Sequence, residues 1–203
     1  YNLLQDIGCR DLTSQSHSFR LQTSLNFKIL KGLTYELKFQ YEKLKTEMEN
    51  YYSVDSYYVR DQLNKWVDYD EANRQITKEY LPDGGMLDKS YNSMNSYYLG
   101  NQVKYHTKID RHEINAGVFT EISTTVNKGY SAPTVFGYDP DRLTSVTPEV
   151  YYPIGSYWGA KNYSVNGMDQ SLSYSDKRFL SLLANAAYKK KKKYSVTGSI
   201  RVD

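Results

Sequence analysis

Hydrophobic and polar residues alternate along the segment from Ser18 to Glu42, on both sides of the pair Lys31-Gly32. Successive side chains of a strand point to opposite faces, so this alternation predicts a β-hairpin with one apolar face and one polar face. Such a hairpin can cover its apolar face with a second sheet, as in a soluble sandwich, or with lipid, as in an outer-membrane barrel. The apolar set is Phe19, Leu21, Leu25, Phe27, Ile29, Leu33, Tyr35, Leu37, Phe39 and Tyr41.

The same alternation returns in two more hairpins, so the expected fold is all-β and antiparallel. Each predicted strand has about ten to twelve residues, which is the length that a tilted strand needs to cross a bilayer. Strands of soluble sandwiches are usually closer to five or six residues. The expected strands are approximately 18–29, 33–44, 97–107, 112–124, 178–189 and 193–203.

The connections between these strands are of two kinds. Turns within a hairpin are short, whereas the segments 45–94 and 125–176 are long loops of roughly fifty residues, far above the usual connection length. Short turns on one side and long loops on the other are typical of outer-membrane barrels, and favour a six-stranded barrel segment over a sandwich. Apolar spacing from Val59 to Val67 predicts a short helix in the first loop, and no regular structure is expected in the second.

Composition is compatible with this interpretation. The net charge of +3 does not call for nucleic acid, and a mean hydropathy of −0.71 without a long apolar run excludes a spanning helix. Cys9 is the single cysteine, which excludes an internal disulfide. Residues 1–4 lack the features of a signal peptide, so we expect a mature or internal piece of an exported protein, or a protein that is not exported.

Tyrosine is unusually frequent, with 22 residues. The tyrosine side chain joins an apolar ring to a polar hydroxyl, which suits membrane interfaces, glycan-binding surfaces and protein interfaces. Aromatic residues near both ends of the predicted strands favour two aromatic girdles over a simple strand preference. They are Phe27, Tyr35, Tyr105, Tyr188 and Tyr194 near the short turns, and Tyr41, Tyr97 and Tyr98 near the long loops.

No catalytic constellation is visible, so we expect neither an enzyme nor a cofactor. The three histidines lack metal-ligand spacing, and Asp139 and Asp141 fit a turn around a proline better than a calcium site. The run Lys189 to Lys193 fits solvated turn residues at a membrane surface better than a nucleic-acid site. Charges of mixed sign on the polar face, such as Arg20, Glu36 and Lys104, predict ion pairs between neighbouring strands.

Candidate ligand-binding residues lie in the long loops. Aromatic planes stack on the apolar faces of sugars, and a guanidinium donates hydrogen bonds, although each of these residues could instead pack a loop or contact a partner. The candidates are Tyr57, Tyr58, Arg60, Trp66, Tyr138 and Trp158.

Several stretches together resemble the SusC/RagA family of TonB-dependent outer-membrane transporters, in order and over nearly the whole chain. Each stretch is a barrel-strand or loop pattern, and none is diagnostic alone. They are LKGLTYELKFQYE (30–42), SYYVRDQLN (56–64), LPDGGML (81–87), HEINAGVFTEIS (112–123), GYDPDRLTSV (137–146) and RFLSLLANAAYKKKKKYSVTGSIRVD (178–203).

The resemblance implies a middle portion, residues 1–203, of a larger barrel in the outer membrane of a Gram-negative cell, without the plug domain and TonB box of the family. It also implies import of oligosaccharides or peptides together with a SusD-like surface lipoprotein, energised by the TonB complex. The alternative is a soluble or surface-exposed β-sandwich or adhesin that binds glycans through its tyrosine-rich loops.

Overall fold

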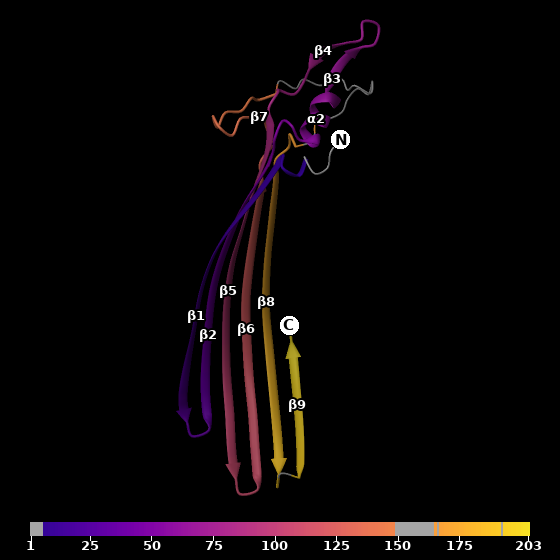
Figure 1. The fold of residues 1–203 in the computed structure, drawn as a ribbon. Helices are drawn as coiled ribbons and strands as arrows, with labels where there is room; N and C mark the ends of the chain where they lie inside the picture. The colour runs from indigo at the N-terminus through magenta and orange to yellow at the C-terminus, as the bar shows by residue number, and fades with distance from the viewer. Residues whose placement is uncertain (1–5, 149–164, 166, 192) are drawn as a thin grey trace. The chain divides into compact units, whose positions relative to one another are not determined.

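The computed structural model describes residues 6–148, 165, 167–191 and 193–203, and it is dominated by long antiparallel strands (Figure 1). Their order in the main sheet is β1-β2-β5-β6-β8-β9, with β7 paired to β5, and β3 and β4 form a separate two-stranded sheet. The expected class, an all-β antiparallel sheet of six strands in three hairpins, is confirmed. The elements are β1 (Arg10–Leu30), β2 (Leu33–Tyr52), α2 (Tyr57–Lys65), β3 (Val67–Asp70), β4 (Gln75–Glu79), β5 (Gly85–Ile109), β6 (His112–Ser131), β7 (Val135–Tyr138), β8 (Ser171–Lys190) and β9 (Tyr194–Val202).

Five of the six long strands have 20 to 25 residues, about twice the expected length. The added residues are mostly polar on both faces, as in 45–50, so the apolar pattern did not reveal them. They stay extended because ladder hydrogen bonds to a neighbouring strand satisfy their backbone regardless of side-chain polarity. The segments that connect the long strands are therefore 53–84 and 132–170, in place of the expected 45–94 and 125–176. Elements α2, β3 and β4 lie in the first, and β7 lies in the described part of the second.

The chain divides into two compact units. The first comprises residues 1–16, 46–92 and 129–173, and the second comprises residues 17–45, 93–128 and 174–203. All nine buried hydrophobic residues of the described chain belong to the first unit, where Val59, Trp66, Met86 and Phe136 form the centre of a small core. This core holds helix α2 against residues from the β4–β5 segment and strand β7.

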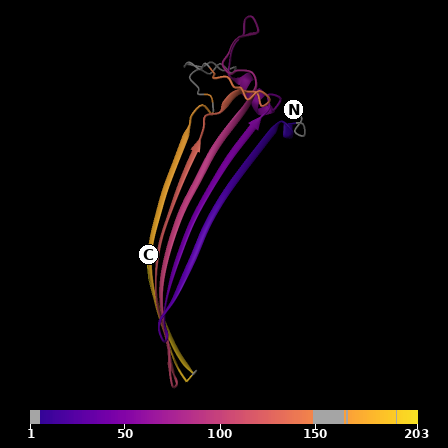
Figure 2. The same cartoon turned by 90° about the vertical axis from the view of Figure 1, so that its left-hand side faces the viewer.

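The second unit has no such core among its described residues. Its strands form a single layer, as Figures 1 and 2 show from two directions, and large hydrophobic side chains remain open on one face. The register of β8 and β9 pairs Leu182 with Val202 and Tyr188 with Val196, while Asn185 pairs with Ser199 on the other parity. This register confirms the predicted separation of apolar and polar residues onto opposite faces for this hairpin.

The three short turns of the second unit need unusual backbone angles. Gly32 has φ +85°, and a Cβ placed there would lie 2.2 Å from the carbonyl oxygen of His106. Asp110 and Lys191 occupy the same left-handed region at φ 50° and 52°. Glycine at such a turn avoids the steric cost of a side chain, and aspartate is one of the residues that tolerate this conformation.

Candidate functional site

Helix α2 carries three of the candidate ligand-binding residues. Its N-cap is Ser56, whose hydroxyl accepts a hydrogen bond from the backbone N–H of Val59 at 3.2 Å. Such a side-chain cap satisfies one of the free N–H groups of the first turn. Burial of Val59 and Gln62 fixes one side of the helix against the core, which leaves Tyr57, half exposed at 51%, directed towards solvent.

Tyr58 belongs to a polar and aromatic cluster at the end of β2. Its ring lies 4.7 Å from the ring of Tyr52, measured between centroids, and the guanidinium of Arg10 stands 5.2 Å over the same Tyr52 ring. Arg10 Nε donates to Asn50 Oδ1 at 2.8 Å, and Asn50 Nδ2 donates to the Tyr52 hydroxyl at 2.7 Å. Partial burial raises the pKa of Tyr58 above its usual range, so this phenol is a neutral hydrogen-bond donor at physiological pH.

Trp66 is a core residue, although its aromatic side chain had made it a candidate for stacking on a ligand. Its side chain is 2% exposed, and the indole Nε1–H donates to Gln62 Oε1 at 3.3 Å inside the core. A ring enclosed in this way presents no face to a ligand. The apolar spacing that predicted the helix had already placed Trp66 on the same side as Val59 and Leu63, and this was the signal for burial.

Tyr138, at the end of β7, lies apart from Tyr58. It contacts Tyr51 edge to face at 5.8 Å, whereas Tyr58 contacts Tyr52. Consecutive residues of a strand point to opposite faces, so the two candidates lie against opposite sides of β2. Trp158 lies outside the described residues. The predicted set therefore does not form one aromatic platform.

Arg60 lines a cavity that the sequence did not reveal. The cavity has a volume of about 230 Å³ and joins the Arg60 side chain to Glu79 and Asp83 over apolar residues that include Leu63 and Leu81. A guanidinium beside two carboxylates over an apolar floor can bind a ligand with both charges and a hydrophobic part. Residues this far apart in sequence meet because α2 and β4 belong to the same compact unit.

A second cavity, of about 480 Å³, adjoins the first. It shares Glu79 and Asp83 with the Arg60 cavity and is also lined by Val146 and Pro148. The two carboxylates therefore line both hollows, together with Arg60 in the first and Lys78 in the second, so the lining carries charges of both signs.

Two ion pairs join neighbouring strands on the polar face of the second unit, as predicted, and Glu36 also pairs with Lys38 of its own strand. The guanidinium of Arg20 donates to both carboxylate oxygens of Glu42 at 2.9 Å, and Glu36 lies 3.2 Å from Lys38 and 3.5 Å from Lys104. Exposed pairs of this kind contribute little to stability, because water already solvates both charges. The pairs instead determine the character of the polar face, which carries, among its described residues, charges of both signs and no ring of charges of one sign.

The turn at Asp139 is a local structure. Asp139 Oδ1 accepts hydrogen bonds from the backbone N–H groups of Asp141 and Arg142, at 2.9 and 3.2 Å. This is the side-chain to backbone pattern of an Asx turn, and it agrees with the turn expected around the proline. In the described part of the chain, no three acidic, histidine or cysteine residues gather into a metal-binding group.

Two searches against known sequences gave no relatives. No protein-family model matches the chain, and no curated protein matches it. Within the described residues, no helix is both long enough and apolar enough to span a membrane.

Solved structures do share the fold. Similar chains occur in the structure of the RagAB peptide transporter and in structures of the RagAB peptide importer in its closed-closed and open-open states. Each aligns with a TM-score of 0.65 and 16% sequence identity, over 96% of this chain and 18% of the matched chain. The chain thus has the fold of a portion, about a fifth by length, of the RagAB chains that it matches.

Proposed function

We propose that this chain forms part of the wall of an outer-membrane β-barrel, in a TonB-dependent importer of the SusC/RagA type. The observation that carries the proposal is the uncovered apolar face of the second unit. Phe19, Phe27, Val118 and Leu180 are between 47% and 67% exposed, although large apolar patches are rare on soluble monomers. A face of this kind needs an apolar surrounding, and lipid supplies one without a second sheet.

Aromatic pairs on this face support placement in a bilayer. Phe27 stacks on Tyr35 at 6.1 Å near the short turn, and Tyr41 lies 4.9 Å from Tyr97 further along the strands. Tyr97 and Tyr105 on β5 are eight residues apart, which corresponds to about 27 Å along a strand and about 19–22 Å of depth at a typical tilt. Outer-membrane barrels have aromatic girdles on both sides of an apolar band about 25 Å tall.

The polar face then lines the lumen. The paired charges of Arg20 with Glu42, and of Glu36 with two lysines, suit a wall that contacts water or a folded partner inside the barrel. The role is transport and not catalysis. In the family that the sequence resembles, the cargo is an oligosaccharide or a peptide, a SusD-like lipoprotein covers the barrel, and the TonB complex supplies energy.

The first unit is the proposed contact region for cargo or lipoprotein. Tyr57 and Tyr58 present partly exposed rings on α2, and Tyr138 presents one on the other side of β2. Arg60, Glu79 and Asp83 bring charges of both signs to the lining of one cavity. A peptide, with charges of both signs and apolar side chains, fits this lining better than an uncharged sugar does.

Spin labels on consecutive residues of β5 test the lipid-facing assignment. In a Cys9→Ser background, Val103→Cys places a label on the apolar parity and Gln102→Cys places one on the polar parity of a strand with neighbours on both sides. In lipid vesicles, we expect the label at position 103 to collide mainly with oxygen and the label at 102 mainly with a water-soluble nickel chelate.

Equal oxygen collision rates at the two positions would contradict the proposal. Shielding of the label at position 103 from both oxygen and the nickel chelate, with the protein monodisperse in buffer without detergent, would instead support the soluble sandwich or adhesin. The two labels occupy adjacent positions, so a difference between them reports the direction of the side chain and not its depth.

A further inference from the structure

Positive charge is concentrated at the three short turns of the second unit. The segments 28–34, 106–112 and 188–194 together contain nine lysine and arginine residues and one acidic residue, Asp110. These 21 residues thus carry a charge of +8, and the other 182 carry −5 of the total of +3. The small net charge of the chain therefore conceals a strong separation of charge.

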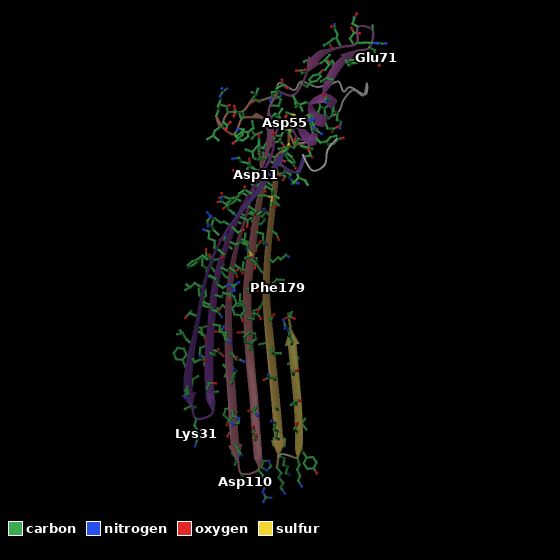
Figure 3. All side chains as sticks on the ribbon, in the orientation of Figure 1. Asp11, Lys31, Asp55, Glu71, Asp110 and Phe179 are labelled. Carbon is green, nitrogen blue, oxygen red and sulfur yellow. The ribbon has the colours of Figure 1, made fainter. Side chains whose placement is uncertain are left out.

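Backbone hydrogen bonds join the three turns into one basic rim. The N–H of Lys191 donates to the carbonyl of Arg111 at 2.8 Å, which links the β8–β9 turn to the β5–β6 turn. The N–H of His106 donates to the carbonyl of Gly32 at 2.7 Å, which links β5 to the β1–β2 turn. Figure 3 shows Lys31 and Asp110 at the ends of neighbouring hairpins in this unit.

The cations of this rim have no acidic partners among the residues that the structure describes. The ion pairs of the second unit lie elsewhere, at Arg20, Glu36, Arg178 and Arg201. Lysines in series repel one another unless an anion lies among them. The rim therefore attracts anions from outside the chain.

Aromatic side chains place this rim at the end of the apolar face. Three partly exposed tyrosines lie within one to three residues of turn lysines in the sequence. They are Tyr105, Tyr188 and Tyr194, at 42%, 38% and 71% exposed. The His112 ring stacks on Tyr188 at 5.8 Å, and its Nδ1 lies 2.5 Å from the Tyr188 hydroxyl. Tyrosines at the end of a membrane-spanning strand lie at the depth of the lipid headgroups.

We propose that the basic rim binds the phosphate groups of anionic phospholipids in the leaflet that meets the short turns. The inference rests on the proposed membrane placement. Headgroup phosphates are the anions at the depth of the tyrosine row, and lysine stems are long enough to lie along apolar surface while the ammonium groups reach the phosphates. Each lysine near an anionic membrane surface strengthens binding about fivefold.

The test uses the protein in phosphatidylcholine vesicles that contain a trace of spin-labelled lipid. The fraction of label immobilised at the protein surface gives the association constant for spin-labelled phosphatidylglycerol relative to spin-labelled phosphatidylcholine. We expect a preference of about fivefold for phosphatidylglycerol, falling at high salt as the Debye length shortens. The variant Lys189→Gln/Lys190→Gln/Lys191→Gln should lower the preference to twofold or less.

A matched variant, Lys65→Gln/Arg74→Gln/Lys78→Gln, removes the same charge from the first unit and should keep the preference. If the unmodified protein immobilises both lipids equally, the lipid-binding inference is wrong while the membrane placement stands. The same holds if the two variants lose the preference for phosphatidylglycerol equally. Immobilisation of neither lipid overturns the membrane placement as well. An unchanged immobilised fraction of phosphatidylcholine shows that each variant is still folded in the bilayer.

Discussion

An arginine at Val118 distinguishes lipid from water as the medium around the apolar face. Val118 is 47% exposed and lies four residues from each of Ile114 and Ile122, the nearest exposed apolar residues on either side of it on this face of β6. Four residues span about 14 Å along the strand, or about 10 Å of depth at a typical tilt, so Val118 lies near the middle of the expected apolar band.

The expected magnitudes for the two media differ clearly. Val118→Arg costs about 2–4 kcal/mol of folding free energy at the midplane of a bilayer, because the guanidinium loses its hydration. On a face exposed to water, the same change stays within about 0.5 kcal/mol. With a guanidinium chloride slope of about 4 kcal/mol per molar, a loss of 3 kcal/mol lowers the unfolding midpoint by about 0.7 M.

The assay is reversible unfolding in phosphatidylcholine vesicles, followed by tryptophan fluorescence. Gln102→Arg is the control, since it adds the same side chain to the polar parity of neighbouring strand β5, and should leave the midpoint within about 0.2 M of the unmodified protein. A Val118→Arg midpoint as high as that of the control would refute the lipid-facing assignment of this parity.

Three further changes test the turns and the first unit. Gly32→Ala should destabilise the protein by about 2 kcal/mol or more in the same assay, since it adds left-handed strain and a contact 2.2 Å from a backbone carbonyl, whereas Gly198→Ala, with nothing within 4 Å, should be neutral. Trp66→Ala should cost about 3–5 kcal/mol and expose segment 53–84 to limited proteolysis; unchanged cleavage would contradict its core position. The Asp70 carboxylate accepts hydrogen bonds from the side chain and the backbone of Asn73, and these lower its pKa. The turn is therefore fully stabilised at pH values above the ordinary aspartate pKa. It loses this stabilisation as the pH falls through the lowered pKa of Asp70. Asn73→Ala should raise the Asp70 pKa measured by carboxyl NMR, and an unchanged value would show that these hydrogen bonds do not form.

The lining of the first unit could not be read from residue types alone. Aromatic type nominated Trp66 and Tyr58 equally, yet one ring is enclosed in the core and the other is partly exposed beside Tyr52. The Arg60 cavity is lined by Glu79 and Asp83, which are separated from Arg60 in the sequence by strands β3 and β4 and the turn between them. Contacts of this range depend on packing, and no local pattern records them.

The alternation of side chains by itself determined which residues share a face, because a strand has a period of two and that period is a property of the local backbone. It located all three hairpins and the tight turns between their strands. The length of the strands was decided by the tertiary structure, because backbone hydrogen bonds to a neighbouring strand continue where the apolar pattern ends. The order of the strands and the continuous basic rim were also decided there, since both depend on which segments lie side by side.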